Sequence, residues 1–386
     1  MTLMQGFPPA EADRATLANW RTQPYSAWAF HHVREVVPSA EIANAPGDVW
    51  ALERGVPLLS DTAIEDILAP TLTDAVVVLH KGRVVHELYR NGMIAEDPHI
   101  LMSVSKSMLG LLAGILADKG LLDLEAGIID YIPELGPTAY AGATVRQALD
   151  MRVGVEFSED YTATSGPIIA YRKAANWNVV EPGEVAPDLR SFQMMLTASD
   201  GPHGGRFHYV SPVTDLLAWV IERAAGRRYA DLMSEHLWQP MGAEKAGYIT
   251  VDRIGGPRAA GGMCVTARDL ARVGQLICQG GARADGRQVI PAAWLEDIAT
   301  AGDREAWTTG DFGERFSDFD MAYRSKWYVH PGEAPLIHGM GIHGQFIFAD
   351  PARDLVVAWM SCEAEPTSDR AFGLRYRLIQ ELRAAL

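Results

Sequence analysis

The positions of the strand-forming segments constrain the fold more than any other feature of this sequence. Residues 74–89 are rich in valine and predict two strands joined by a tight turn at Lys81-Gly82. Residues 345–360 predict a second hairpin, with its turn at residues 350–354. Strands near both chain ends, with helices between them, are typical of one split sheet that carries a helical insertion. The sequence therefore predicts an α/β (α+β) fold with an antiparallel sheet flanked by helices.

The middle of the chain and its C-terminal tail carry helix signals. These are apolar side chains at helical spacing, Thr214 and Thr266 as expected caps, and glycines as expected stops. The expected helices span residues 103–119, 214–225, 266–278 and 368–386. Residues 156–213 and 302–335 contain Gly, Pro and Asn and are expected to form long loops.

These patterns predict two domains. Residues 1–100 and 255–386 are expected to form the sheet domain, with an N-terminal arm of about residues 1–45. Residues 101–254 are expected to form a mainly helical inserted domain. We expect the active site at the junction between the two.

Composition excludes several classes of function. The 386 residues carry a net charge of −15, which repels phosphate backbones and argues against a nucleic-acid partner. The most apolar run, Met108 to Leu116, is too short to cross a bilayer, and the N-terminal residues lack a secretory pattern. The 3 cysteines lack a C-x-x-C spacing and no H-E-x-x-H occurs. We therefore expect a cytoplasmic protein with no membrane partner, no metal and no cofactor.

The pair Ser103 and Lys106 gives the sharpest chemical signal. Residues three apart lie on one face of a helix, so these two side chains can meet. Burial disfavours a charged lysine, and a neutral amine can take the proton of a serine hydroxyl. The same face continues through Gly110 and Gly114, which predicts that another element packs closely on this helix.

Two further segments supply groups that such a serine needs. Tyr209 lies in Phe-His-Tyr-Val-Ser-Pro, and a tyrosine oxygen near a cationic lysine is expected to shift toward phenolate and carry a proton. Residues 339–344 (Gly-Met-Gly-Ile-His-Gly) precede the last hairpin, and a Gly-rich strand edge brings backbone N–H groups close to a substrate carbonyl.

In this order and spacing, the three elements resemble the S-x-x-K, Y-x-S and Gly-rich motifs of the serine β-lactamase and penicillin-binding-protein superfamily, in its class C and esterase branch. Within that branch the chain is most similar to the nylon-oligomer hydrolases. The segments that carry the likeness are 27–39, 101–107, 159–161, 215–223, 264–274 and 341–345.

The resemblance implies a β-lactamase-like fold and a serine hydrolase that acts through an acyl-enzyme. It implies that Ser103 is the nucleophile and that Lys106 and Tyr209 handle the protons. It also implies that the backbone N–H groups of Ser103 and Ile342 form the oxyanion hole.

For the substrate, the resemblance implies that Tyr161 hydrogen-bonds the scissile amide and that Trp177 closes over it. His343 is a further candidate for substrate orientation. The chain departs from the nylon-oligomer pattern at Arg172, where an acidic side chain would meet a substrate amino group, and at Ala260, where a polar residue is usual. An arginine repels an ammonium group and favours a carboxylate or a neutral acyl group.

The expected substrates are small molecules, namely short-chain carboxylic esters and linear amides such as 6-aminohexanoate oligomers. A β-lactamase or D,D-peptidase shares the same residues, although Gly339 replaces the lysine of K-T-G. A non-catalytic binding module on the same fold is a further alternative, and a homodimer is among the expected partners.

Overall fold

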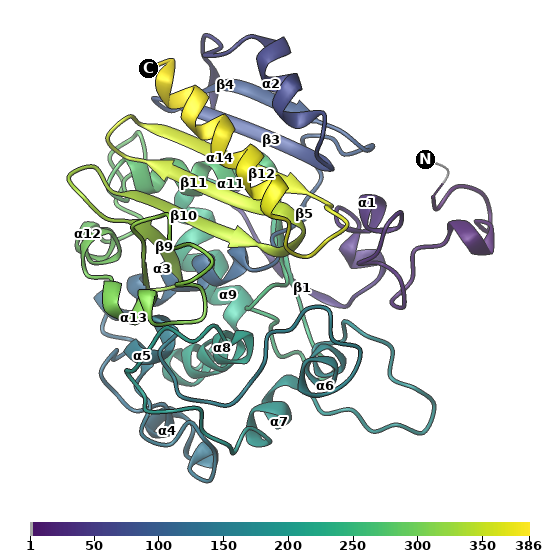
Figure 1. Cartoon of the computed structure of the whole chain (residues 1–386), viewed down its shortest axis with the longest axis vertical. Coiled ribbons are helices and arrows are strands. Elements are labelled where there is room, and N and C mark those ends of the chain that lie inside the picture. The colour runs from purple at the N-terminus through teal and green to yellow at the C-terminus, as the bar shows by residue number, and fades with distance from the viewer. Residues whose placement is uncertain (1–2) are drawn as a thin grey trace.

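The structure, a computed structural model, describes residues 3–386 and contains an eight-stranded sheet built from both ends of the chain (Figure 1). Adjacent strands are antiparallel, except that β2 and β4 are parallel. In spatial order the strands are β2 (Glu53–Arg54), β4 (Arg83–Tyr89), β3 (Thr73–His80), β12 (Leu355–Ser361), β11 (Gln345–Asp350), β10 (Leu336–Gly341), β9 (Trp327–His330) and β8 (Ala322–Arg324). The predicted fold class is confirmed.

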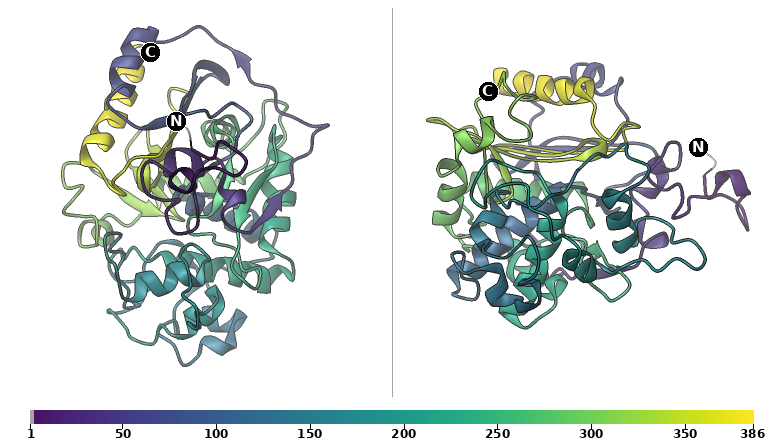
Figure 2. Two further views of the ribbon diagram at one scale, coloured as in Figure 1. Left: turned by 90° about the vertical axis from the view of Figure 1, so that its right-hand side faces the viewer. Right: turned by 60° about the horizontal axis from the view of Figure 1, so that its bottom comes forward.

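Both faces of this sheet are covered. Figure 2 shows α2 (Asp61–Leu68) and α14 (Asp369–Ala384) on one face, and the rest of the molecule on the other. Since side chains alternate along a strand, Leu355, Val357 and Trp359 of β12 contact the core under α2 and α14. Their neighbours Val356 and Ala358 contact the larger core on the opposite face. The nearly continuous apolar sequence of this strand follows from burial on both sides.

The two predicted hairpins are both present. Lys81 (φ 51°) and Gly82 (φ 71°) form the turn between β3 and β4, and a positive φ at both positions matches the twist of the flanking strands. The second turn, at residues 351–354, also contains a residue of positive φ, Asp354.

Helices fill the region below the sheet, and a second, four-stranded sheet connects it with the N-terminal arm. The order of that sheet is β1 (Ser39–Ile42), β6 (Gly247–Thr250), β7 (Met263–Val265) and β5 (His99–Ile100). The remaining helices are α1 (Ser26–Ala29), α3 (Val104–Asp118), α4 (Ile128–Tyr131), α5 (Val145–Leu149), α6 (Pro167–Ala174), α7 (Leu189–Met194), α8 (Ser211–Ala225), α9 (Tyr229–Met233), α10 (Gln239–Met241), α11 (Ala267–Cys278), α12 (Ala292–Thr300) and α13 (Arg304–Thr308). The predicted domain boundaries stay predictions.

The predicted start of one helix is wrong. Thr214 does not cap α8 but is buried inside it, because the helix begins three residues earlier at Ser211. Pro212 is tolerated in the first turn, where a missing N–H removes no hydrogen bond. The Glu159 carboxylate accepts the Ser211 N–H at 2.5 Å and completes this helix end.

The two segments expected to be long loops also contain regular structure. Residues 156–213 include α6 and α7, and residues 302–335 include α13, β8 and β9. These elements have three to eight residues each, too few for isolated helices or strands to be stable in water. Their conformation therefore depends on tertiary packing, which the sequence pattern does not display.

The expected close packing on α3 is present. A side chain at Gly110 would collide with the carbonyl oxygen of Ser325, and one at Gly114 would collide with the Trp294 ring. The Trp294 indole donates a hydrogen bond of 3.0 Å to the Gly110 carbonyl. The helix that carries Ser103 and Lys106 is thereby fixed against its neighbours.

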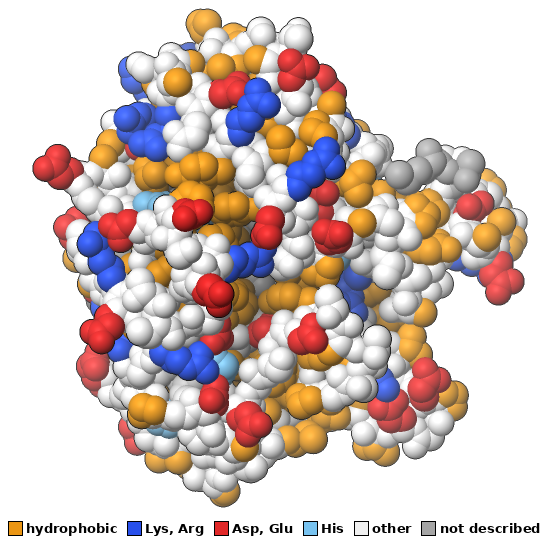
Figure 3. All heavy atoms as spheres, viewed as in Figure 1, with side chains coloured by type: hydrophobic (Ala, Val, Ile, Leu, Met, Phe, Trp, Pro, Cys, Tyr) orange, Lys and Arg blue, Asp and Glu red, His pale blue; other side chains and the backbone are white. Residues whose placement is uncertain are grey.

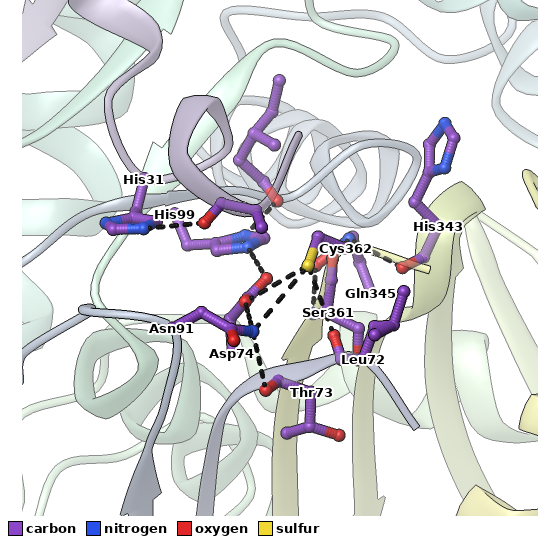
Figure 4. A network of polar contacts seen from close by, with 12 residues as sticks. His31, Leu72, Thr73, Asp74, Asn91, His99, His343, Gln345, Ser361 and Cys362 are labelled. Carbon is purple, nitrogen blue, oxygen red and sulfur yellow. Dashed lines mark hydrogen bonds and ion pairs between the residues drawn. The ribbon is translucent and has the colours of Figure 1, made fainter. Parts of the chain in front are cut away.

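A buried polar network connects β3, β5 and the residues after β12 (Figure 4). His99 of β5 contacts the Asp74 carboxylate at 3.0 Å, while Asn91 donates to the other carboxylate oxygen of Asp74 at 2.7 Å. The Cys362 thiol lies 3.3 Å from the same oxygen of Asp74. Because β5 leads directly into the site described below, this network fixes the start of that segment. Among residues 3–386, no helix combines the length and the hydrophobicity needed to cross a bilayer.

Candidate active site

Ser103 lies at a sharp turn between β5 and α3. Leu101 pairs with Met263 of β7 through a backbone hydrogen bond of 2.8 Å, and Met102 then adopts a positive φ of 45°. This left-handed residue turns the chain from the strand into the helix, so that Ser103 occupies the N-cap position and keeps part of its surface exposed. The nucleophile candidate is thus presented at a helix N-terminus, where developing negative charge is favoured.

Lys106 lies one turn further along α3 and points at the serine. Its Nζ donates hydrogen bonds to Ser103 Oγ at 2.9 Å and to the Ala260 carbonyl oxygen at 2.7 Å. The side chain is 1% exposed. Burial lowers the pKa of the Lys106 amine from 10.5 to about 7; Arg258 lowers it further, and Glu159 and Asp215 act in the opposite direction. A neutral amine is therefore accessible near neutral pH.

The Ala260 carbonyl is itself held in place by a buried ion pair. Ala260 N–H donates to the Asp215 carboxylate at 2.8 Å, and Arg258 donates to the other oxygen of that carboxylate at 2.6 Å. Asp215 thus fixes the backbone that accepts one Lys106 hydrogen bond. In the sequence, Asp215 stood out only as the first residue of one similar segment.

Tyr209 reaches the same point from the other side of the cleft. Its hydroxyl hydrogen-bonds the side chains of Ser103 and Tyr328, and its ring centroid lies 5.0 Å from Lys106 Nζ. Burial, followed by the Glu159 carboxylate, raises the pKa of Tyr209 above its ordinary value. The raised pKa is the opposite of the expected shift toward phenolate. The cost of burying a charged phenolate is larger than the stabilisation that the nearby Lys106 amine provides.

The segment that positions Tyr209 was not identified from the sequence. The Asp311 carboxylate accepts the Tyr209 N–H at 2.8 Å and contacts His208 Nδ1 at 2.9 Å. The next residue, Phe312, packs its ring 5.1 Å from the Tyr209 ring. Part of the segment expected to be a long loop, residues 302–335, therefore holds the Tyr209 phenol in place.

The glycine-rich end of β10 approaches Ser103 closely. A side chain at Gly341 would lie 3.0 Å from Ser103 N and 2.7 Å from the Leu101 carbonyl oxygen, so only glycine allows this packing. Ile342 follows directly and borders the same cavities as Ser103. A side chain at Gly339 would lie 2.8 Å from Ser107 Oγ, so a lysine there would require Ser107 to shift.

Glu159 is a second site residue that the sequence marked only as the first position of a similar segment, 159–161. Besides accepting the Ser211 N–H, it hydrogen-bonds the hydroxyl of Tyr161 and is the largest opposing influence on the pKa of Lys106. One carboxylate therefore organises the substrate-side tyrosine and stabilises the ammonium form of Lys106.

Cavities of different character lie next to Ser103. The first, of about 110 Å³, is bordered by Tyr209 and by apolar and aromatic side chains, including Phe312, Phe316, Tyr328, Met340, Phe346 and Phe372. Four charged residues also border it, and two of its arginines are paired with acids, Arg315 with Asp369 and Arg375 with Glu363. A smaller one, of about 30 Å³, is bordered by Glu159, Trp177 and three arginines. In the space-filling view, hydrophobic side chains line the hollow between the sheet and the helices below it, and both basic and acidic side chains surround it (Figure 3).

The predicted substrate-binding residues are only partly brought together. Tyr161 and Arg172 both border the smaller cavity, and Arg172 donates to the Tyr161 carbonyl at 3.1 Å. Trp177 lies there too, with its indole donating to Thr250 Oγ1 at 3.1 Å. His343 borders an adjoining cavity of about 280 Å³ that Tyr161 and Arg172 also line, while its Nδ1 bonds the Glu363 carbonyl at 2.7 Å and its ring packs on Phe30. Its role in substrate orientation stays a prediction. Motion of Trp177 as a lid stays a prediction.

No group of three or more His, Cys, Asp or Glu side chains within residues 3–386 is arranged to hold a metal ion. The groups around Ser103 are an amine, a phenol, a hydroxyl and backbone N–H groups. Such groups form covalent acyl intermediates by proton transfer and oxyanion stabilisation.

Comparison with known proteins agrees with this chemistry. The Beta-lactamase family matches residues 61–382, so the chain belongs to that family, and it is a serine hydrolase. It is 35% identical over 385 residues to the 6-aminohexanoate-dimer hydrolase of Paenarthrobacter ureafaciens. The alignment covers 98% of this chain and 96% of that protein. The resemblance inferred from the motifs is thereby confirmed.

Solved structures give the same result. A Bacillus anthracis protein named as a 6-aminohexanoate-dimer hydrolase superposes with a TM-score of 0.85 at 27% identity, over 98% of both chains. A family VIII carboxylesterase superposes with a TM-score of 0.62 at 16% identity, over 86% of this chain and 99% of that one, and therefore shares the fold.

Proposed function

We propose that the protein hydrolyses short-chain carboxylic esters and linear amides through an acyl-enzyme on Ser103. The observation that carries this proposal is the contact of 2.9 Å between Ser103 Oγ and the buried Lys106 amine. A serine hydroxyl is a poor nucleophile until a base removes its proton, and an amine with a pKa of about 7 is matched to that task.

In the first step, Ser103 Oγ bonds to the substrate carbonyl carbon while its proton passes to Lys106 Nζ. The N–H groups of Ser103 and Ile342 stabilise the oxyanion. The Tyr209 phenol then protonates the leaving alcohol or amine as the carbonyl–heteroatom bond breaks, and it regains a proton from the Lys106 ammonium. In the second step, water attacks the acyl carbon as its proton passes to the neutral Lys106. Tyr209 then protonates Ser103 Oγ as the bond to the acyl carbon breaks and regains its proton from the Lys106 ammonium.

The raised pKa of Tyr209 supports its role as a proton donor, because a phenol that stays protonated can serve as a general acid. The named relatives support linear amides among the substrates. The glycine at position 339 disfavours a β-lactamase or D,D-peptidase, since it replaces the lysine of K-T-G and any side chain there would require Ser107 to shift. The predicted cytoplasmic location and homodimer stay predictions.

A p-nitrophenyl ester and a serine-directed phosphonate test the proposal. We expect ester turnover, a covalent mass increase located on Ser103, and loss of both in Ser103→Ala at a nearly unchanged melting temperature. A non-catalytic binding module would give no modification, and turnover retained in Ser103→Ala would contradict the proposal. Assaying 6-aminohexanoate dimer and a chromogenic cephalosporin beside the ester distinguishes the substrate classes.

A further inference from the structure

Two arginines beside Ser103 donate their hydrogen bonds to neutral oxygens rather than to carboxylates. Of the three that border the smaller cavity, Arg258 is paired with Asp215 at 2.6 Å. Arg21, from the N-terminal arm, donates to Asn178 Oδ1 at 2.5 Å, and its buried Nε has no hydrogen-bond acceptor within residues 3–386. Arg172 donates to the carbonyl oxygen of Tyr161. Over the same residues, neither Arg21 nor Arg172 forms an ion pair with Asp or Glu.

The acidic groups nearby, Glu159 and Asp160, favour the charged form of Arg172 but form their hydrogen bonds with other groups. Glu159 borders the same cavity, but it accepts the Ser211 N–H and the Tyr161 hydroxyl and faces Lys106. The Asp160 carboxylate is exposed and accepts hydrogen bonds from Thr162. Burial, followed by repulsion from Arg172 and Arg258, lowers the pKa of Arg21 to about 9. An anion bound between Arg21 and Arg172 would remove this repulsion.

The two arginines also border an adjoining, larger cavity. Arg21, Tyr161, Arg172 and Ile342 line both the cavity of about 30 Å³ next to Ser103 and a second one of about 280 Å³. A chain that extends from Ser103 into the larger space therefore passes the two guanidinium groups. The Arg21 guanidinium is held 5.8 Å from the centroid of the Trp177 ring, which keeps it at this position.

The two sides of Ser103 can be assigned to the two parts of a substrate. Tyr209 protonates the leaving group in the proposed reaction, and Tyr209 borders the aromatic cavity but not the arginine-lined one. The leaving group therefore occupies the aromatic side, and the acyl chain extends past Arg21 and Arg172.

We infer that Arg21 and Arg172 bind a carboxylate at the far end of the acyl chain, so that the preferred substrates are half-esters and half-amides of aliphatic dicarboxylic acids. This inference rests on the proposed function of Ser103. Planar guanidinium groups bind carboxylates with two parallel hydrogen bonds, and a partly buried site strengthens them. The arginine pair thus selects an anionic acyl chain and rejects one that ends in an ammonium group.

Three esters with the same leaving group test the inference: mono-p-nitrophenyl adipate, its methyl ester and p-nitrophenyl 6-aminohexanoate. We expect kcat/KM for the free carboxylate to exceed that for the methyl ester by about tenfold or more, with a preference that weakens as salt increases. Arg172→Gln and Arg21→Gln should bring this ratio close to one, and Arg172→Lys should retain part of it. Arg227→Gln, an exposed arginine paired with Glu235, is the matched control and should leave the ratio unchanged.

A binding assay separates failure of the inference from failure of the proposed function. Monomethyl adipate should raise the melting temperature of the wild-type protein more than dimethyl adipate does, and Arg172→Gln should abolish the difference. This difference in melting temperature is expected even if the protein cleaves no ester. Absence of ester cleavage would overturn only the proposed function. Ester hydrolysis without a preference for the carboxylate, or with a preference for the ammonium ester, would overturn the inference and leave the proposed function intact.

Discussion

The two halves of the active site are built in different ways. Ser103 and Lys106 lie three residues apart on one buried helix, and their contact of 2.9 Å follows from helical geometry. The groups opposite them, Tyr209 and Ile342, come from separate segments and are placed by contacts such as that of Asp311 with the Tyr209 backbone. The helix half is therefore fixed by local structure, whereas the facing half depends on tertiary hydrogen bonds that can be removed singly.

The largest effect is expected in the helix half. Lys106→Met removes the base that activates Ser103, and we expect kcat/KM for p-nitrophenyl butyrate to fall by about a thousandfold or more. Methionine fills a similar volume without a buried amine, so the melting temperature should not fall. Steady-state kinetics and thermal unfolding measure the two effects. Activity within tenfold of the wild type would show that Lys106 is not the base.

The same division explains what could be predicted from the sequence. The hairpins, α3 and its close packing at Gly110 follow from patterns that lie within short segments. The Tyr209 motif and the Gly-rich segment could be recognised only through their order along the chain. Asp311 gave no signal of its own, because an acidic residue in a loop becomes a positioning group only when the fold brings it to Tyr209.

The pKa of Tyr209 shows a further limit of prediction from sequence. From the motifs alone, the nearby lysine suggested a lowered value, yet burial and Glu159 raise it. The degree of burial is a property of the assembled cleft, and here it decides the sign. The prediction of where α8 starts was wrong for a related reason. The Glu159 carboxylate, which accepts the first N–H of that helix, lies 52 positions away in the chain.

An intermediate effect is expected in the facing half. Asp311→Asn weakens the hydrogen bonds to the Tyr209 N–H and to His208, so the phenol should be held less firmly. We expect kcat to fall by about tenfold with little change in KM, and stability to fall by about 1–3 kcal/mol. The measurements are steady-state kinetics and denaturant unfolding.

Asp318→Asn, on the same loop and exposed, is the matched control for this variant and should change neither quantity. If Asp311→Asn lowers stability but leaves kcat intact, Tyr209 is positioned by its own packing and the two halves of the site are more alike than we argue.

The smallest effect concerns the electrostatic link between the two halves. Only the neutral form of Lys106 accepts the serine proton, so kcat/KM for an ester should rise with pH through a midpoint of about 7. Glu159 favours the ammonium form, so Glu159→Gln should move this midpoint to lower pH, while Glu156→Gln, an exposed neighbour, should not. Profiles measured from pH 5 to 9 at constant ionic strength test the shift. A midpoint that stays fixed or moves upward in Glu159→Gln would mean that Glu159 does not raise the pKa of Lys106.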